Sequence, residues 1–231
     1  MFRDQLVRAS LYAREAEVKA FIHMSRKKRC SSRLTIDRAR LPALIVEAEL
    51  LLGNRGDTTM SIIRHPIWQY AYFVEDIDEA CHKWHKMMGA GPFTVVRHHI
   101  AEDFRYKGEH VEADVSYAFG QAGPAHIQFI AQHDDTPSIY RDMYKKGEYG
   151  FHHIGLLIHD LADEVARFEA AGYPSVCTLW GGDYVHYVDA RHDLGCYVEL
   201  HGDAPIIQDM FNGLKRDHEA WDGDVSGLIR E

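Results

Sequence analysis

Hydrophobic and polar residues follow a regular order only after about residue 66. Ile67–Val74 is a run of aromatic and β-branched residues, which is typical of a strand. Asp76 is placed to cap a helix that runs to about Met88 and ends at Gly89. Three further strands are predicted in this part of the chain, at 93–98, 110–119 and 125–131. The order is therefore one strand, one helix and three strands.

The same order returns later in the chain. A strand is predicted at 151–158, and Asp160 is expected to cap a helix through Ala171. Three more strands are predicted, at 174–180, 183–189 and 195–201. Gln69–Ile77 aligns with His153–Leu161 at an offset of 84 residues, and 126–130 aligns more weakly with 196–200. The chain therefore contains two copies of a βαβββ unit.

These patterns predict an α+β fold of two paired βαβββ modules that form a curved sheet cleft. One sheet face of each unit is covered by its helix and the other is open, so two units can join their open faces around a cleft. We expect one domain over 60–204, followed by a polar tail with one helix near 208–218. The expected units are module one at 66–132, module two at 151–202, a loop with a helical turn between them, and the C-terminal tail at 205–231.

Residues 1–59 differ in composition from the remainder and are expected to be an N-terminal extension, partly helical or disordered. They hold 12 Lys and Arg against 7 Asp and Glu, whereas 60–231 holds 14 against 28. Helices are plausible at 4–24 and 38–52. The extension is open to three interpretations: a targeting segment, a basic run at Arg26–Arg29 that is either a nuclear signal or, more commonly, a solvated face, or an over-extended reading frame. We favour the last, with Met60 as the native start.

Composition excludes several classes of protein. With 46% hydrophobic and 11% aromatic residues, the chain is a globular protein rather than a disordered one. Its most apolar stretch, Leu41–Leu52, contains two glutamates and is shorter than the ~20 residues of a membrane span. The acidic body disfavours nucleic-acid binding. Four widely spaced cysteines without a CxxC motif indicate reduced thiols and a cytoplasmic protein.

The repeat also brings together residues that can hold a metal. Gln69 superposes on His153, and Gln128 superposes on Glu199 when the last strands are set at an offset of 71. If a pseudo-twofold axis relates the modules, these four side chains can converge in the cleft. One imidazole, one carboxylate and two amides suit a divalent ion with open positions, such as Zn²⁺, Co²⁺, Ni²⁺, Mn²⁺ or Fe²⁺.

The repeat and these residues resemble the vicinal oxygen chelate superfamily, which includes glyoxalase I, methylmalonyl-CoA epimerase, extradiol dioxygenases and bleomycin-resistance proteins. The most specific stretches are Gly150–Gly155 with Asp160–Leu161, and Asp189–Glu199. The resemblance implies a metal ligand at each of the four positions above, and we expect a homodimer. Like the epimerases, the chain has Gln at position 128. With Gln at position 69, the facial triad of the dioxygenases is incomplete, which disfavours ring cleavage.

One carboxylate leaves the bound ion as a Lewis acid that can polarise a carbonyl and acidify the adjacent C–H. Glu199 is a candidate base if it leaves the metal, and Glu112, on the predicted third strand of module one, is a second candidate. His152 is expected to face the other side of the sheet and to be structural.

The sequence therefore predicts a metal-dependent isomerase, epimerase or glyoxalase-like lyase that acts by proton transfer on a small carbonyl or thioester. The alternatives are a metal-dependent dioxygenase of the same fold and a non-catalytic protein that binds a small molecule.

Overall fold

The computed structural model describes residues 61–231 of the chain. The two helices predicted at 4–24 and 38–52, and the basic run at 26–29, lie outside this part. Within 61–231 no helix is both long and apolar enough to cross a membrane. Cys81, Cys177 and Cys196 are buried and free.

Module one follows the order that the hydrophobic pattern predicts, with an added hairpin. Its elements are β1 (Ile67–Phe73), α3 (Ile77–Met88), β2 (Phe93–Ile100), β3 (Arg105–Tyr106), β4 (Glu109–His110), β5 (Asp114–Ala122) and β6 (Ala125–Gln132). The helix α3 begins as predicted at Asp76, whose side chain accepts a hydrogen bond from Glu79 N, and it ends at Gly89 in the left-handed conformation.

Module two repeats this order without the hairpin. A short helix α4 (Ile139–Met143) connects the modules, and α7 and a last strand follow module two. The remaining elements are β7 (Gly150–Ile158), α5 (Leu161–Ala170), β8 (Ser175–Leu179), η1 (Trp180–Gly182), β9 (Val185–Val188), α6 (Arg191–Leu194), β10 (Tyr197–Gly202), α7 (Pro205–Ala220), η2 (Val225–Gly227) and β11 (Ile229–Arg230). Asp160 is the N-cap residue of α5, as predicted, although its side chain makes no capping hydrogen bond.

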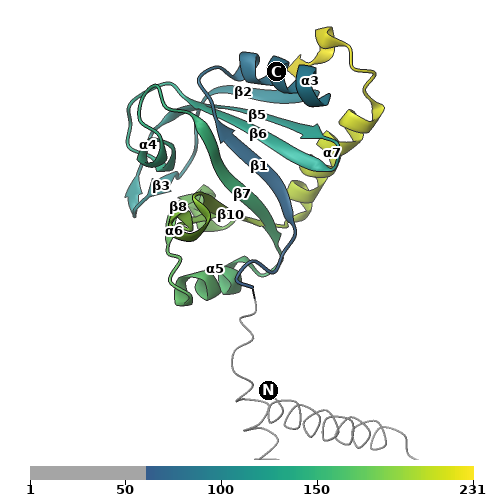
Figure 1. The fold of residues 1–231 in the computed structure, drawn as a ribbon. Coiled ribbons are helices and arrows are strands. Elements are labelled where there is room, and N and C mark those ends of the chain that lie inside the picture. The colour runs from purple at the N-terminus through teal and green to yellow at the C-terminus, as the bar shows by residue number, and fades with distance from the viewer. Residues whose placement is uncertain (1–60) are drawn as a thin grey trace, which may run out of the picture. The chain divides into compact units, whose positions relative to one another are not determined.

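The strands form one curved sheet in the order β11-β2-β5-β6-β1-β7-β10-β9-β8-β3-β4. In each module the first strand pairs in parallel with the last one, β1 with β6 and β7 with β10. The antiparallel pair of β1 and β7 lies side by side in the middle of the sheet and joins the modules (Figure 1). This confirms the α+β fold with paired βαβββ modules, although the modules join edge to edge and not through their open faces.

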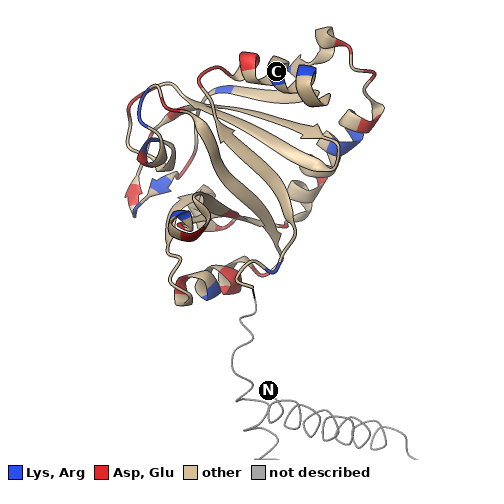
Figure 2. Ribbon diagram, viewed as in Figure 1, with Lys and Arg blue, Asp and Glu red and all other residues tan. Residues whose placement is uncertain are grey.

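Charged side chains are mainly carried by the helices and the connecting loops, while the central strands β1, β6 and β7 carry none (Figure 2). A charge inside a folded protein is costly unless it is paired, so a sheet covered on both faces keeps its central strands uncharged. An ionisable group at the middle of the sheet therefore needs a partner.

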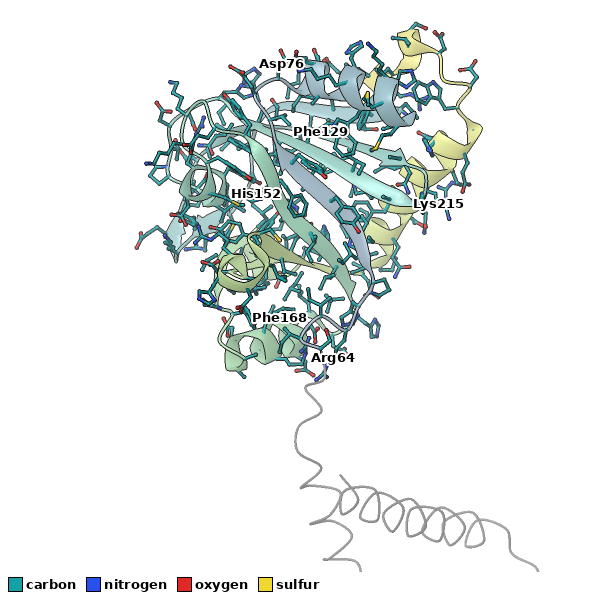
Figure 3. All side chains as sticks on the ribbon, in the orientation of Figure 1. Arg64, Asp76, Phe129, His152, Phe168 and Lys215 are labelled. Atoms are coloured by element: carbon teal, nitrogen blue, oxygen red, sulfur yellow. The ribbon has the colours of Figure 1, made fainter. Side chains whose placement is uncertain are left out.

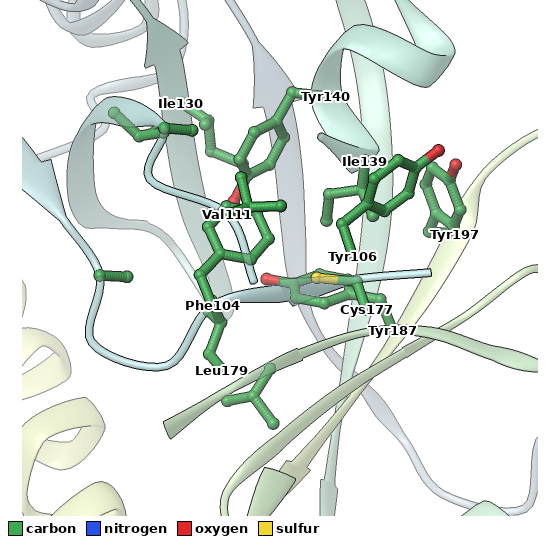
Figure 4. Close-up of a cluster of buried hydrophobic side chains, with 14 of the residues drawn as sticks. Phe104, Tyr106, Val111, Ile130, Ile139, Tyr140, Cys177, Leu179, Tyr187 and Tyr197 are labelled. Carbon is green, nitrogen blue, oxygen red and sulfur yellow. The ribbon is translucent and has the colours of Figure 1, made fainter. Parts of the chain in front are cut away.

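The outer face of the sheet is covered by one helix in each module. Phe129 packs beneath α3 in one buried cluster, and Phe168 of α5 belongs to a second cluster (Figure 3). The inner face carries a third cluster, rich in tyrosine, which includes Tyr140, Tyr187 and Tyr197 (Figure 4). Because strand side chains alternate, every second residue of the central strands faces this inner side.

The prediction of a single strand at 110–119 is wrong in its first half. The hairpin of β3 and β4 interrupts it, and β3 pairs with β8 at the edge of module two. Residues 111–113 are irregular, and β5 begins only at Asp114. Glu112 is therefore not on a strand, and it is exposed. The tail helix, α7, is longer than the 208–218 predicted.

We predict that Asp76→Ala lowers the free energy of unfolding by about 1 to 2 kcal/mol, because the substitution removes the capping bond of α3. Asp160→Ala is the matched control, since Asp160 occupies the same place before α5 without a capping bond. We expect its loss to be smaller by about 1 kcal/mol. Denaturant unfolding of both variants checks this, and equal losses would contradict it.

Candidate metal and substrate site

The four residues expected as ligands lie together at the middle of the sheet, on its inner face. Gln69 is on β1, Gln128 on β6, His153 on β7 and Glu199 on β10, and all four are at most 5% exposed. These four strands are consecutive in the sheet. We call these four residues the tetrad.

The sheet register explains why the tetrad can close. Ala71 of β1 is paired with both Gln128 and His153, and Gly155 of β7 is paired with both Gln69 and Glu199. A Cβ on Gly155 would lie 2.9 Å from Gln69 Cβ and 3.1 Å from Glu199 Oε2. A small residue on each central strand thus leaves room for the ligand side chains of the neighbouring strands. Ala71 and Gly155 are themselves separated by the repeat offset.

A β-bulge precedes the tetrad residue on each central strand. The pairing of β1 with β7 shifts between Ile67 and Gln69, and again between Ala71 and Tyr72. The first shift leaves Trp68 unpaired, and the second leaves His152 unpaired opposite. Bulges re-aim neighbouring side chains and are common next to functional sites. The two bulges occupy equivalent places in the two modules.

The side chains of the tetrad are in close contact. Gln69 Nε2 donates a hydrogen bond to Gln128 Oε1 at 2.5 Å and lies 3.4 Å from His153 Nε2. His153 Nε2 lies 3.6 Å from Glu199 Oε2. The amide oxygen is the metal-binding atom of a glutamine, and half a turn of the Gln69 amide exchanges its nitrogen for its oxygen.

Glu199 provides the test of whether these residues fit a metal. Its Oε1 accepts a hydrogen bond from the Tyr187 hydroxyl at 2.8 Å, whereas its Oε2 is buried without a hydrogen-bond partner. The 3.6 Å to His153 Nε2 is too long for a hydrogen bond. It falls within the roughly 3 to 4 Å that separates two ligands, each ~2.0 to 2.2 Å from a shared ion. The tetrad therefore fits a divalent cation.

His152 orients the imidazole of His153. Its Nε2 lies 3.3 Å from the carbonyl oxygen of Ile139, and its Nδ1 lies 2.9 Å from His153 Nδ1. Burial, and then the neighbouring His153, lower the pKa of His152 well below its usual value, so this ring is neutral. Its Nε2–H must donate to the carbonyl oxygen of Ile139, so its Nδ1 accepts a hydrogen bond from His153 Nδ1–H. His153 Nε2 is left to hold either a proton or a cation.

Glu199 is ionised at neutral pH. Burial acts to raise the pKa of its carboxyl, but the adjacent His153 imidazole and the Tyr187 hydroxyl outweigh it and lower the pKa to about 2. This carboxylate is buried and one of its oxygens has no hydrogen-bond partner, so a positive charge within the tetrad would stabilise it. The imidazole and carboxylate thus favour a cation that both can share.

A cavity of about 260 Å³ opens from the tetrad. Gln69, Gln128 and Glu199 line its inner end, and the imidazoles of His99 and His201 also line it. The remaining walls are mainly apolar and aromatic and come from both modules and from α7. Sequence reasoning assigned no role to His99 and did not single out His201.

The structure does not bring Glu112 to this site. It lies exposed between β4 and β5 and is not part of the cavity wall. Glu112 was predicted to lie on a regular strand. This prediction is wrong because the β3–β4 hairpin displaces the start of β5.

A second group of metal-binding side chain types lies outside the tetrad. Ligand atoms of His98, Asp114 and His133 all lie within 4.8 Å of one another, and His98 Nδ1 is 2.9 Å from Asp114 Oδ2. His98 and His133 are exposed. This group has no contact with the tetrad among the described residues, but any count of bound metal per chain has to take it into account.

We predict that Gly155→Ala weakens divalent-metal binding about tenfold without unfolding the protein, because the new Cβ collides with Gln69 and crowds Glu199. Gly202→Ala on β10 is the control, since its nearest neighbour would be 3.6 Å away, an ordinary contact. Calorimetric titration with Zn²⁺ measures both. Equal affinities in the two variants would show that Gly155 does not hold the ligands apart.

Comparison with known proteins agrees with this arrangement. The sequence model of the Glyoxalase/Bleomycin resistance protein/Dioxygenase superfamily matches residues 68–186, about half of the chain. The chain belongs to this superfamily. The match includes three of the four tetrad residues and ends before β10, so Glu199 and the helix α7 lie beyond it. A search of curated proteins finds no match.

Three solved structures serve as examples of those to which the chain is similar. The methylmalonyl-CoA epimerase of Mycobacterium tuberculosis is 18% identical, with 65% of this chain and 95% of that chain covered and a TM-score of 0.46. A hypothetical protein from Bacillus halodurans C-125 is 13% identical, with 62% and 96% covered and a TM-score of 0.44. A Streptomyces coelicolor methylmalonyl-CoA epimerase in complex with 2-nitronate-propionyl-CoA is 15% identical, with 61% and 98% covered and a TM-score of 0.38.

Proposed function

We propose that this superfamily member is a divalent-metal-dependent isomerase or epimerase, or a glyoxalase-like lyase, that transfers a proton alpha to a carbonyl. The unpaired, buried Oε2 of Glu199 facing His153 Nε2 is the observation that carries the proposal. Gln69, Gln128, His153 and Glu199 are the proposed ligands. A divalent ion held there supplies Lewis-acid polarisation of the carbonyl and so acidifies the adjacent C–H.

The side chains of the site have different roles in the proposed reaction. His153 presents Nε2 in an orientation that His152 fixes, and Tyr187 holds one oxygen of Glu199. When it is not bound to the metal, Oε2 of Glu199 is the proposed base that removes and returns the proton, because it lies at the end of the cavity without a competing hydrogen bond. One base permits a one-sided isomerisation.

Epimerisation needs a second proton carrier on the other side of the substrate. Since Glu112 is remote from the cavity, the proposed carriers are the imidazoles of His99 on β2 and His201 on β10. Comparing turnover of His99→Gln and His201→Gln separates them. An epimerase loses exchange in one direction when its second carrier is removed, whereas an isomerase with one base does not.

The test of the function is solvent exchange. The purified protein is incubated in deuterated water with a panel of acyl-CoA thioesters and hemithioacetals. We expect deuterium at the α-carbon of at least one compound, loss of this exchange with a chelator, and recovery on adding Zn²⁺, Co²⁺ or Ni²⁺. Metal content is compared in His133→Ala as well, so that the exposed His98 group is counted separately.

The other outcomes identify the alternative functions. Oxygen consumption with catechols, without exchange, would replace the proposal with a dioxygenase. A protein that binds no metal at the tetrad and exchanges no proton would be a binding protein. The homodimer, the cytoplasmic location and the domain boundary at residue 60 stay predictions, tested by light scattering, localisation of a tagged full-length chain, and mass spectrometry of the native N-terminus.

A further inference from the structure

The walls of the cavity beside the tetrad are apolar. Phe119 comes from module one, Leu179 and Trp180 come from module two, and Met210 and Phe211 come from α7. No Lys or Arg is among the residues that line the cavity in the described part of the chain. The surface presented to a substrate is therefore neutral apart from the tetrad and two imidazoles.

The α7 wall is held in place by tilted and edge-to-face aromatic contacts. The ring of Phe211 lies 3.9 Å from that of Trp68 on β1, measured between ring centroids, and 5.6 Å from that of His201 on β10. Both modules thus contact the same residue of α7. This helix, like β10, lies beyond the region that the superfamily model matches.

The size of the cavity limits what fits. An apolar cavity of roughly 150 Å³ in another protein is large enough for benzene. By that scale the 260 Å³ here accommodates a group of about ten non-hydrogen atoms. A single methyl group would leave most of the cavity unfilled, and unfilled apolar volume contributes no binding energy.

A carboxylate on the substrate would meet an unfavourable environment here. Against the apolar walls, away from the cation proposed at the tetrad, it would have no Lys or Arg of the described residues to pair with, and an unpaired charge away from water is costly. An aromatic or branched aliphatic group instead contacts Phe119, Trp180 and Phe211, which favours burial of apolar surface.

We propose that the substrate carries a neutral, bulky apolar group, aromatic or branched aliphatic, next to the reacting carbon, and that dicarboxylic acyl groups such as methylmalonyl are poor substrates. The reaction in this inference is that of the proposed function, on which it rests. The specificity is argued from the cavity alone.

A matched pair of thioesters tests the inference. 2-Phenylpropionyl-CoA and methylmalonyl-CoA share the carrier and the α-methyl group and differ in a phenyl ring against a carboxylate. We expect α-deuterium exchange of the phenyl compound to have at least a tenfold larger kcat/KM. Faster exchange of methylmalonyl-CoA would overturn the inference and leave the proposed function standing.

Binding without catalysis separates the two proposals. With chelator present, the protein is titrated with 2-phenylpropionamide and with 2-phenylpropionate, which have nearly the same shape and differ in charge and in the N–H donors of the amide. We expect the amide to bind at least tenfold more tightly. Absence of amide binding would overturn the inference whatever the exchange assay shows, whereas amide binding without any exchange would remove only the proposed function.

A substitution in the cavity wall provides the final control. Met210→Arg places a cation at the cavity from a partly exposed position on α7. We expect it to raise the methylmalonyl to phenylpropionyl ratio of kcat/KM at least tenfold. Ile206→Arg on the same helix is the control, since Ile206 is 73% exposed and does not line the cavity, and it should leave the ratio unchanged. An unchanged ratio in Met210→Arg would contradict the role given to the neutral wall.

Discussion

Replacing Glu199 by Gln is expected to lower α-proton exchange by about 10³-fold and to weaken divalent-metal binding by at least about 100-fold. The substitution keeps the size of the side chain and the acceptor for the Tyr187 hydroxyl. It removes the charge that is shared with His153 and the free oxygen that we propose as base. Both effects fall on one residue because Glu199 is the only carboxylate in the wall of the cavity, among the described residues.

Two measurements separate these effects. Metal affinity comes from competition with a chromophoric chelator, and exchange is then measured at a metal concentration that saturates the variant. Glu169→Gln on the exposed side of α5 is the control for charge loss alone. If Glu199→Gln keeps full metal affinity and exchange, Glu199 is not part of the site. Glu112→Gln provides a further comparison, since the earlier interpretation of Glu112 as a base survives only if that variant loses exchange.

The tetrad was predictable from the sequence because the repeat is regular where the site lies. An offset of 84 carries Gln69 onto His153 and also Ala71 onto Gly155. Because β1 and β7 are paired antiparallel, these four positions are neighbours in the sheet. Alternation along each strand then places the ligands on the inner face and the apolar residues between them beneath α3 and α5. The repeat in the sequence thus predicts which positions lie next to one another in the sheet.

The errors arise where the periodicity is broken. Glu112 was placed by counting along one continuous strand, but the β3–β4 hairpin leaves module one to pair with β8, a contact that no local pattern encodes. His152 was assigned to the opposite sheet face by strict alternation. The bulge at His152 suspends that alternation, so both adjacent histidines point their Nδ1 atoms at each other. The His-His pair was visible in the sequence, whereas the bulge was not.

The second large effect is expected at this bulge. We predict that His152→Phe weakens metal binding by about 10- to 100-fold, although His152 is not a ligand. Phe keeps an aromatic ring among Tyr140 and Tyr197 but has no nitrogen to accept the hydrogen bond from His153 Nδ1–H. His153 is then free to carry its proton on Nε2, the atom that faces Glu199, and a protonated Nε2 cannot bind a cation.

Determining the tautomer of His153 distinguishes whether His152 orients the His153 ring or only packs against its neighbours. In ¹⁵N NMR of the metal-free protein at neutral pH, we expect the wild-type His153 to show a protonated Nδ1 and the variant to show increased protonation of Nε2. His186→Phe is the control, because it removes hydrogen bonds to Ser175 and Gly182 outside the cavity wall, and it should change neither the metal affinity nor the His153 signal. A weaker metal affinity in His152→Phe with an unaltered His153 tautomer would assign His152 to packing alone. An unaltered metal affinity in His152→Phe would show that the hydrogen bond between the two Nδ1 atoms does not contribute to metal binding. The contacts of His153 within the tetrad would then be what orients its Nε2.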